Sequence, residues 1–154
     1  MTQVKINTTN VFHKAYAADT RVVCLQGGTR SSKTYSLCQM FIIKCLKETG
    51  KVYSIIRKTL PACKGSVYRD FISILKELDL YSQENHNKSD LSYTLNNNLC
   101  EFLSVDNPEK LKGRKRSSAW LNEATEFSYE DYQQIIFRTE EQIYLDYNPS
   151  DPYS

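Results

Sequence analysis

The chain has 154 residues and a formal net charge of +2, and 40% of its residues are hydrophobic and 25% charged. This composition is typical of a globular protein with one domain, and it excludes a disordered or fibrous chain. The sequence contains neither a membrane-length apolar run nor the apolar core of a signal peptide, so we expect a cytosolic protein that does not associate with membranes.

The first half of the chain alternates between strand and helix patterns. Residues 21–26 form an apolar run typical of a buried strand, and residues 33–49 have apolar side chains at helical spacing, followed by Gly50 as a helix stop. Residues 51–57 read as a second strand, and Pro61 leads into a second amphipathic helix. This order predicts a parallel α/β sheet.

The second half of the chain continues this pattern. Residues 91–95 and 99–105 flank three asparagines, which tolerate the positive φ angles of a tight turn, so we expect a hairpin. Residues 106–116 are polar and basic. A strand over 117–121, a helix over 129–138 and a strand over 142–147 follow.

The five cysteines are widely spaced, and no CxxC pair indicates a zinc or redox site. They are Cys24, Cys38, Cys45, Cys63 and Cys100. Most of them lie in apolar segments, so we expect free, buried thiols.

A phosphate-binding loop is predicted where the first strand turns into the first helix. The turn consists of Gly27, Gly28, Thr29, Arg30, Ser31, Ser32, Lys33 and Thr34. Such a turn directs backbone N–H groups and the positive end of the helix dipole at one small volume. In the Walker A pattern, Lys33 reaches the β- and γ-phosphates and the Thr34 hydroxyl binds Mg²⁺, while Ser32 stands where the pattern has a glycine.

Two later segments have polar residues at the ends of predicted strands. Residues 118–126 resemble a Walker B segment, with Asn122 in the position that holds the metal and Glu123 in the position of the base that polarises the attacking water. Asn148 follows the last strand. If that strand lies between the Walker A and Walker B strands, Asn148 faces the γ-phosphate as a sensor. The alternative is that the Asn148-Pro149 dipeptide only turns the chain.

The other candidates are less specific. Phe12, His13 and Tyr16 precede the first strand, where they either contact an adenine base or belong to the core. His86 lies in a polar stretch that offers it no partner, and we assign it no role.

Taken together, these motifs resemble the N-terminal ATPase domain of the large terminase subunit of tailed bacteriophages. The resemblance rests on the turn at residues 27–34, on residues 56–61 and 66–71, on residues 120–126 and on residues 147–149, and it runs from about Val11 to the last residue. It implies a P-loop NTPase fold of the additional-strand, catalytic-glutamate type. We expect one mostly parallel domain over residues 1–154, incomplete at its C-terminal edge and without a nuclease domain.

The resemblance also implies an ATP- and Mg²⁺-dependent motor that moves double-stranded DNA into the procapsid in the cytoplasm of the infected bacterial host. The expected partners are the portal protein, the small terminase subunit and further copies of the chain in a ring. Arg30 would contact the γ-phosphate, because a guanidinium can bind two phosphate oxygens. Arg114 is the candidate finger that reaches the ATP of the next subunit. For the basic segment 110–116, a solvated loop and direct DNA contact are the alternatives.

The departures from the family pattern leave a second hypothesis open. Ser32 replaces a glycine that lets the backbone approach phosphate, and Asn122 replaces an acidic residue. The alternative is therefore a non-catalytic, degenerate nucleotide-binding or oligomerisation fragment. A small P-loop kinase fits the length of the chain, but Glu123 argues against it.

Overall fold

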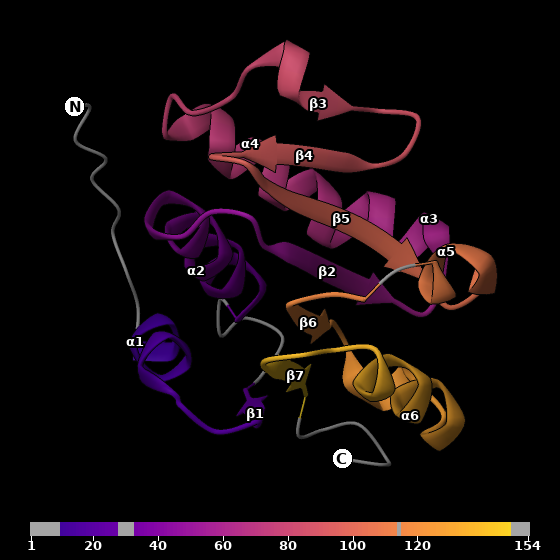
Figure 1. The fold of residues 1–154 in the computed structure, drawn as a ribbon. Helices are drawn as coiled ribbons and strands as arrows, with labels where there is room; N and C mark the ends of the chain where they lie inside the picture. Colours follow the sequence, from indigo (N-terminus) through magenta and orange to yellow (C-terminus); the bar gives the residue numbers. More distant parts are fainter. Residues whose placement is uncertain (1–9, 28–32, 114, 149–154) are drawn as a thin grey trace.

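The computed structural model describes residues 10–27, 33–113 and 115–148, and in this part of the chain a seven-stranded sheet lies between helices (Figure 1). The strands are β1 Val22–Gln26, β2 Val52–Arg57, β3 His86–Asn87, β4 Ser92–Leu95, β5 Asn98–Ser104, β6 Ser118–Leu121 and β7 Ile143–Tyr147. The helices are α1 Asn10–Ala17, α2 Lys33–Lys47, α3 Leu60–Cys63, α4 Arg69–Glu77, α5 Pro108–Lys112 and α6 Tyr129–Phe137. No helix in the described ranges is both long and apolar enough to cross a membrane.

The strand order is β1-β7-β6-β2-β5-β4-β3, and all pairs from β1 to β5 are parallel. The hairpin strand β4 and the short β3 continue the sheet in antiparallel pairing. The predicted mostly parallel α/β fold is therefore confirmed, as is the position of the last strand between β1 and β6. Parallel pairing brings the carboxyl ends of β1, β7 and β6 to the same edge of the sheet.

The larger core lies between the sheet and helices α1, α2 and α4. Its centre is Phe41 of α2, whose ring centroid lies 5.4 Å from that of Tyr53, 5.9 Å from Trp120 and 5.4 Å from Tyr144. Three sheet strands thus anchor the helix that begins at the predicted phosphate loop. A large aromatic side chain in such a position stabilises the fold by several kcal/mol, about 3 to 5 on truncation to alanine.

A smaller core lies on the opposite face of the sheet, beneath α5 and α6. Its buried members are Ile56, Leu103, Leu111, Ala119, Leu121, Ile135 and Ile143. Helix α6 begins with a capping box, in which the Ser128 hydroxyl accepts from the Asp131 N–H and the Asp131 carboxylate accepts from the Ser128 N–H. This reciprocal pairing fixes where α6 starts, because it satisfies N–H groups that a helix leaves unbonded.

The predicted turns form as expected. Asn96 and Asn97 have φ of 52° and 61°, which gives the tight hairpin between β4 and β5. Gly50, with φ of 76°, follows the end of α2. The second predicted helix is interrupted, since a π-helical turn at Lys64–Tyr68 joins α3 to α4.

Several elements of the described chain were not expected from the sequence: α1, the two-residue strand β3, α5 within the polar and basic stretch, and the short helical turns Gln83–Asn85 and Ala124–Glu126. The expectation of buried thiols holds for four cysteines but is wrong for Cys24, which is exposed. Cys24 lies in β1, which pairs only with β7 among the described strands, and the side chains of this strand alternate between buried and exposed.

Candidate functional site

The candidate site lies at the carboxyl ends of β1, β6 and β7. Gly27 follows β1, Asn122 and Glu123 follow β6, and Asn148 follows β7. The pairing of β7 with both neighbours brings these residues to one edge, as the sequence predicted. Gly28, Thr29, Arg30, Ser31 and Ser32 lie outside the described residues.

Lys33 is the first residue of α2 and is buried, with only 7% of its surface exposed. Its ammonium donates to the carbonyl oxygen of Gly27, and to that of Tyr147 at 2.7 Å. Both carbonyls lie at strand ends, so the side chain bridges the ends of β1 and β7. The positive charge of Lys33 acts to lower the pKa of Glu123 and of Asp146. The three charged groups are therefore close enough to interact electrostatically.

Asp146 is a candidate site residue that was not predicted from the sequence. It lies in β7 with 1% of its surface exposed, and its carboxylate accepts three hydrogen bonds. Oδ2 accepts from Trp120 Nε1 at 2.5 Å and from Asn122 Nδ2 at 3.0 Å, and Oδ1 accepts from the Glu123 N–H at 3.2 Å. In these contacts with described residues both oxygens accept, which is the hydrogen-bonding pattern that favours the ionised carboxylate.

Burial raises the pKa of Asp146, and the hydrogen bonds from Asn122, Trp120 and Glu123 together with the charge of Lys33 counteract this only in part. The sequence did carry a signal for this residue, because an aspartate within the otherwise apolar strand Ile143–Tyr147 is uncommon. What the sequence could not supply was the identity of its partners on β6.

Glu123 has a left-handed backbone, with φ of 57° and ψ of 61°, directly after β6. A non-glycine residue in this conformation carries strain, which is common at functional sites. The hydrogen bond from its N–H to Asp146 holds it in place. Burial raises the pKa of Glu123, and the negative charge of Asp146 raises it further.

Asn122 is buried with 2% of its surface exposed, and its amide nitrogen bonds to Asp146. This contact directs its amide oxygen away from the carboxylate. Thr34 lies half-buried in the first turn of α2. Together these two side chains supply the oxygen atoms that the sequence assigned to a metal.

Arg57, at the end of β2, connects this region to the helix that begins at Leu60. Its Nε donates to Glu126 Oε1 at 3.1 Å, in the short helical turn after Glu123. Its Nη1 donates to Ser66 Oγ at 2.7 Å in the π-helical turn.

The basic residues of segment 110–116 differ in how deeply they are buried. Arg114, the candidate finger, lies outside the described residues. Arg116 is fully buried and donates to Ser54 Oγ at 2.9 Å and to the Leu111 carbonyl at 2.7 Å. It is therefore a core residue and is not available to DNA or nucleotide, while Lys110, Lys112 and Lys115 are exposed.

For the residues before β1, the structure supports the core alternative in one case. Phe12 is buried in the larger core, whereas His13 is exposed. Tyr16 is half-buried, with the Lys47 ammonium 5.2 Å from its ring centroid. The expectation that His86 has no partner is wrong, because its Nε2 lies 2.5 Å from the Tyr68 hydroxyl and its Nδ1 2.7 Å from the Tyr81 hydroxyl.

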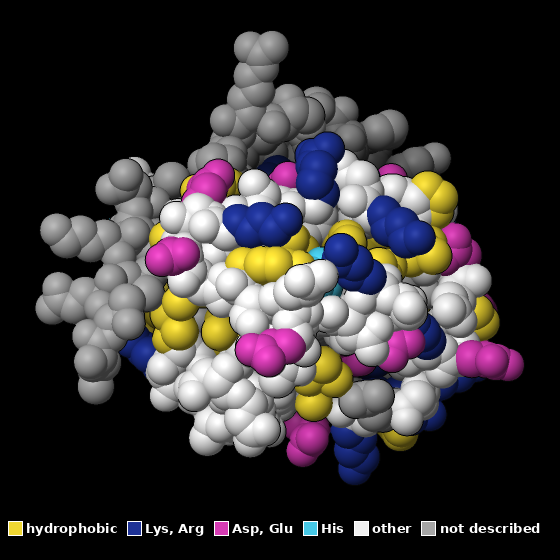
Figure 2. Space-filling model, turned by 90° about the horizontal axis from the view of Figure 1, so that it is seen from above, with side chains coloured by type: hydrophobic (Ala, Val, Ile, Leu, Met, Phe, Trp, Pro, Cys, Tyr) yellow, Lys and Arg dark blue, Asp and Glu magenta, His cyan; other side chains and the backbone are white. Residues whose placement is uncertain are grey.

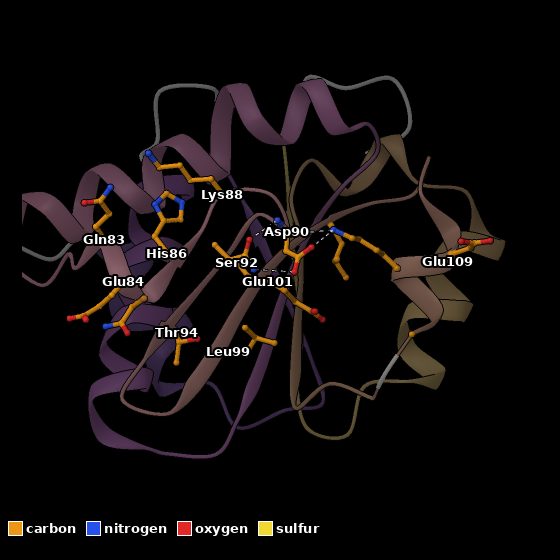
Figure 3. Close-up of a pocket in the computed structure, with 15 residues that line it drawn as sticks. Gln83, Glu84, His86, Lys88, Asp90, Ser92, Thr94, Leu99, Glu101 and Glu109 are labelled. Carbon is orange, nitrogen blue, oxygen red and sulfur yellow. Dashed lines mark hydrogen bonds and ion pairs between the residues drawn. The ribbon is translucent and has the colours of Figure 1, made fainter.

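A large hollow lies elsewhere in the described part of the chain, on the face of β4 and β5 that α5 and α6 leave open (Figure 3). It encloses about 1160 Å³ and is lined mainly by polar side chains, among them Ser92, Thr94 and Glu101. None of the predicted site residues that the structure describes lines it.

Comparison with known proteins identifies the family. Residues 19–154 match the family model described as phage terminase large subunit. The PBSX phage terminase large subunit of Bacillus subtilis (strain 168) is 31% identical over 116 residues, which cover 74% of this chain and 27% of that protein. The chain therefore spans about a quarter of the length of this relative.

Solved structures show the same fold. The large terminase from a thermophilic bacteriophage superimposes with a TM-score of 0.78 at 15% identity, covering 96% of this chain and 41% of that one. The complex of that terminase with ATP-gamma-S gives a TM-score of 0.74 at 14% identity, covering 96% and 39% of the two chains. The bacteriophage Phi-29 viral genome packaging motor assembly gives 0.63 at 14% identity, covering 95% and 49%. By its sequence match and its fold, the chain belongs to the phage terminase large subunit family.

Proposed function

We propose that this chain binds and hydrolyses ATP as the ATPase domain of a viral DNA-packaging motor. The observation that carries the proposal is the convergence of Lys33, Asn122, Glu123 and Asp146 at the ends of three adjacent parallel strands. Ligands of open α/β sheets bind at this edge. The ATP-gamma-S complex of the terminase from the thermophilic bacteriophage supports nucleotide as the ligand.

Lys33 and the loop before it bind the phosphates. In the described structure two backbone carbonyls hold the ammonium, which has three N–H donors, so one donor remains to reach a phosphate oxygen. Arg30 contacts the γ-phosphate, and backbone N–H groups of residues 27–34 surround the β-phosphate. Asn148, at the end of β7, contacts the γ-phosphate as a sensor.

The oxygen atoms at the site fit Mg²⁺, which is usually held by one or two protein oxygens together with phosphates and water. Thr34 offers its hydroxyl and Asn122 its amide oxygen. Among the described residues no group of three His, Cys, Asp or Glu side chains is placed to hold a metal by itself. When bound, Mg²⁺ neutralises charge on the β- and γ-phosphates.

Asp146 supplies the negative charge that Asn122 lacks. The two side chains are hydrogen-bonded at 3.0 Å, so the carboxylate lies directly behind the amide that occupies the Walker B position. The chain thus carries on β7 the charge that the Walker B pattern places on β6.

Glu123 acts as the general base. It accepts a proton from a water molecule as the water oxygen attacks the γ-phosphorus, and the bond from phosphorus to the β,γ-bridging oxygen breaks to release ADP and phosphate. The raised pKa of Glu123 makes its carboxylate a stronger base. Arg114 completes the site of the neighbouring subunit as a finger that stabilises transition-state charge.

We also propose an assembly, a cellular location and partners for this domain. The domain works as a homo-oligomeric ring in the cytoplasm of the infected host, where it moves double-stranded DNA through the portal protein with the small terminase subunit. The similarity to a genome packaging motor supports this setting.

Calorimetry with ATP and Mg²⁺ tests the proposal. We expect the parent chain to bind, Lys33→Ala to lose binding, and Glu123→Gln to bind normally but to stop turnover in the assembled motor. The absence of heat at millimolar ATP would favour the alternative, a non-catalytic fragment, for which the neutral Asn122 is the supporting observation. Turnover by Glu123→Gln would refute the assignment of the base.

A further inference from the structure

A positively charged surface lies at the side of the domain formed by α4 and β3. We call it the basic face and define it by Lys64, Arg69, Lys76 and Lys88, which surround His86 and are all exposed. Figure 2 shows Lys and Arg side chains gathered around a histidine on the face seen from above. Figure 3 shows the side chain of Lys88 passing the imidazole of His86.

The helical segment from Lys64 to Lys76 carries three of these cations, Lys64, Arg69 and Lys76, which line one hollow. Lys64, Tyr68, Ile72 and Lys76 are spaced four residues apart, and Arg69 and Ser73 form the adjacent row. Lys64 lies in the π-helical turn at Lys64–Tyr68 and lines the same hollow as Arg69 and Lys76. At about 1.5 Å per residue, the row of cations extends over about 18 Å.

A shallow hollow of about 410 Å³ follows this row. It is lined by Lys64, Tyr68, Arg69, Ser73, Lys76 and His86 over a floor formed by Ile72, and no carboxylate lines it. Asp70 contacts Arg69 Nε at 3.2 Å, but this ion pair is exposed and leaves the other guanidinium nitrogens available.

The aromatic groups beneath the cations add a hydroxyl donor. His86 lies between the Tyr68 and Tyr81 hydroxyls, and burial together with the charges of Lys88 and Lys76 lowers its pKa, which favours the neutral ring. A neutral imidazole donates through one nitrogen and accepts through the other. When His86 donates to Tyr68 and accepts from Tyr81, the Tyr68 O–H is free to donate into the hollow.

We propose that the basic face binds the phosphate backbone of double-stranded DNA. The inference rests on the proposed function, because a packaging motor must hold its DNA. A DNA strand carries one phosphate per about 3.4 Å of helix axis, so a cation row of about 18 Å spans several phosphates. Lys, Arg, Ser and Tyr donors are typical of backbone contacts that do not read sequence, as genome packaging requires.

The alternative occupant is an acidic protein segment. Stable protein interfaces have an apolar or aromatic centre. At the basic face the apolar and aromatic groups, Ile72, Tyr68 and His86, are buried or half-buried, while the exposed groups of the hollow are Lys64, Arg69, Ser73 and Lys76. The observations therefore favour a polyanion with phosphates at regular intervals.

Binding of a duplex oligonucleotide, measured by fluorescence anisotropy without nucleotide at increasing salt, tests the inference. The variant combines Lys64→Gln, Arg69→Gln and Lys76→Gln. Three neutralised phosphates correspond to a salt slope of about −2.7, or a loss of about 40-fold in affinity between 50 and 200 mM salt. We expect the variant to flatten the slope by about 2 to 3 and to weaken binding at 50 mM salt by about tenfold or more.

Two charge-matched triple variants serve as controls. The first combines Lys14→Gln, Lys44→Gln and Lys47→Gln on α1 and α2, and the second combines Lys110→Gln, Lys112→Gln and Lys115→Gln in the basic segment. Both should retain the parent slope within about 0.5, and an equal loss in either control would overturn the assignment. Binding of polyglutamate in place of duplex DNA would identify the acidic-segment alternative instead.

Lys33→Ala separates this inference from the proposed function. It should lose ATP binding and keep the DNA salt slope. The parent chain could fail to bind ATP while the salt slopes of the basic-face variant and the two control variants still differ as expected. In that case DNA binding by the basic face is supported and the ATPase assignment is not. If ATP binds and the slopes do not differ, the basic face is refuted alone.

Discussion

Exchanging the amide and the carboxylate of Asn122 and Asp146 tests the claim that the charge of the Walker B position has moved to β7. Asn122→Asp alone places two carboxylates about as close as the present contact of 3.0 Å in a buried site. At an effective dielectric constant of 20, their repulsion is about 5.5 kcal/mol. Protonation of one carboxyl limits the cost to about 4 kcal/mol at pH 7, because each pH unit above an ordinary pKa of about 3.9 costs about 1.36 kcal/mol.

Asp146→Asn alone has a different cost. The introduced amide has one acceptor oxygen, so it cannot accept from Trp120 Nε1 and from the Glu123 N–H on opposite sides of the group. An unsatisfied buried donor costs about 1 to 3 kcal/mol. The double exchange again pairs one carboxylate with one amide, and we expect it to recover at least about 2 kcal/mol relative to the sum of the two single changes.

Urea unfolding of the parent, both single variants and the double variant measures this coupling. At pH 7 Asn122→Asp should be less stable than the parent by about 3 to 4 kcal/mol, and the difference should shrink toward pH 4 as one carboxyl is protonated. Asn107→Asp, at an exposed position, is the matched control and should stay within about 0.5 kcal/mol. Additive single effects, or an Asn122→Asp variant as stable as the parent at pH 7, would refute the reasoning.

Two further predictions concern buried charges. Arg116→Met should lower the free energy of unfolding by about 2 to 4 kcal/mol, because it leaves the Leu111 carbonyl and Ser54 without their donor, whereas Lys115→Met should change it by less than about 0.5 kcal/mol in the same denaturation assay. Equal losses would show that Arg116 does not support the core. Since burial raises the pKa of Asp146 in the folded state, its contribution is most favourable below the unfolded pKa of about 3.9 and declines as pH rises through the folded pKa. The stability of the parent relative to Asp146→Asn should therefore fall from pH 4 to pH 8, and a rising difference would contradict the direction of the shift.

The strands, the main helices and the hairpin could be predicted because their signals are local. Apolar runs, the helix stop at Gly50 and the two asparagines of the hairpin each act within a few residues. The meeting of Lys33, Asn122 and Glu123 was also predictable, because parallel strands bring their carboxyl ends to one edge. The roles of residues 28–32 and of Arg114 remain predictions.

The other features of the fold and the site could not be predicted, because they depend on contacts that form only when the chain folds. Nothing local distinguishes Arg116 from the exposed lysines around it, because its burial is decided by Ser54 and by the carbonyls of α5 and α6. The hydrogen-bond partners of His86 could not be predicted, because only the folded chain places the Tyr68 and Tyr81 hydroxyls beside its ring. Asp146 was visible as a charge in an apolar strand, but its role depends on which strand pairs with β7.

The two side-chain contacts of Arg57, with Ser66 and with Glu126, differ in strength. The bond to Ser66 is part-buried, whereas Glu126 is 42% exposed, and a surface ion pair of this kind contributes at most about 1 kcal/mol. The turn after Glu123 can therefore detach from Arg57 at a cost close to thermal energy, a population change of about fivefold, while Arg57 stays with the helix that carries the basic face. This ion pair therefore adds little rigidity between the helical segment bonded to Arg57 and the turn after Glu123, which Ala124 and Phe127 hold against the smaller core.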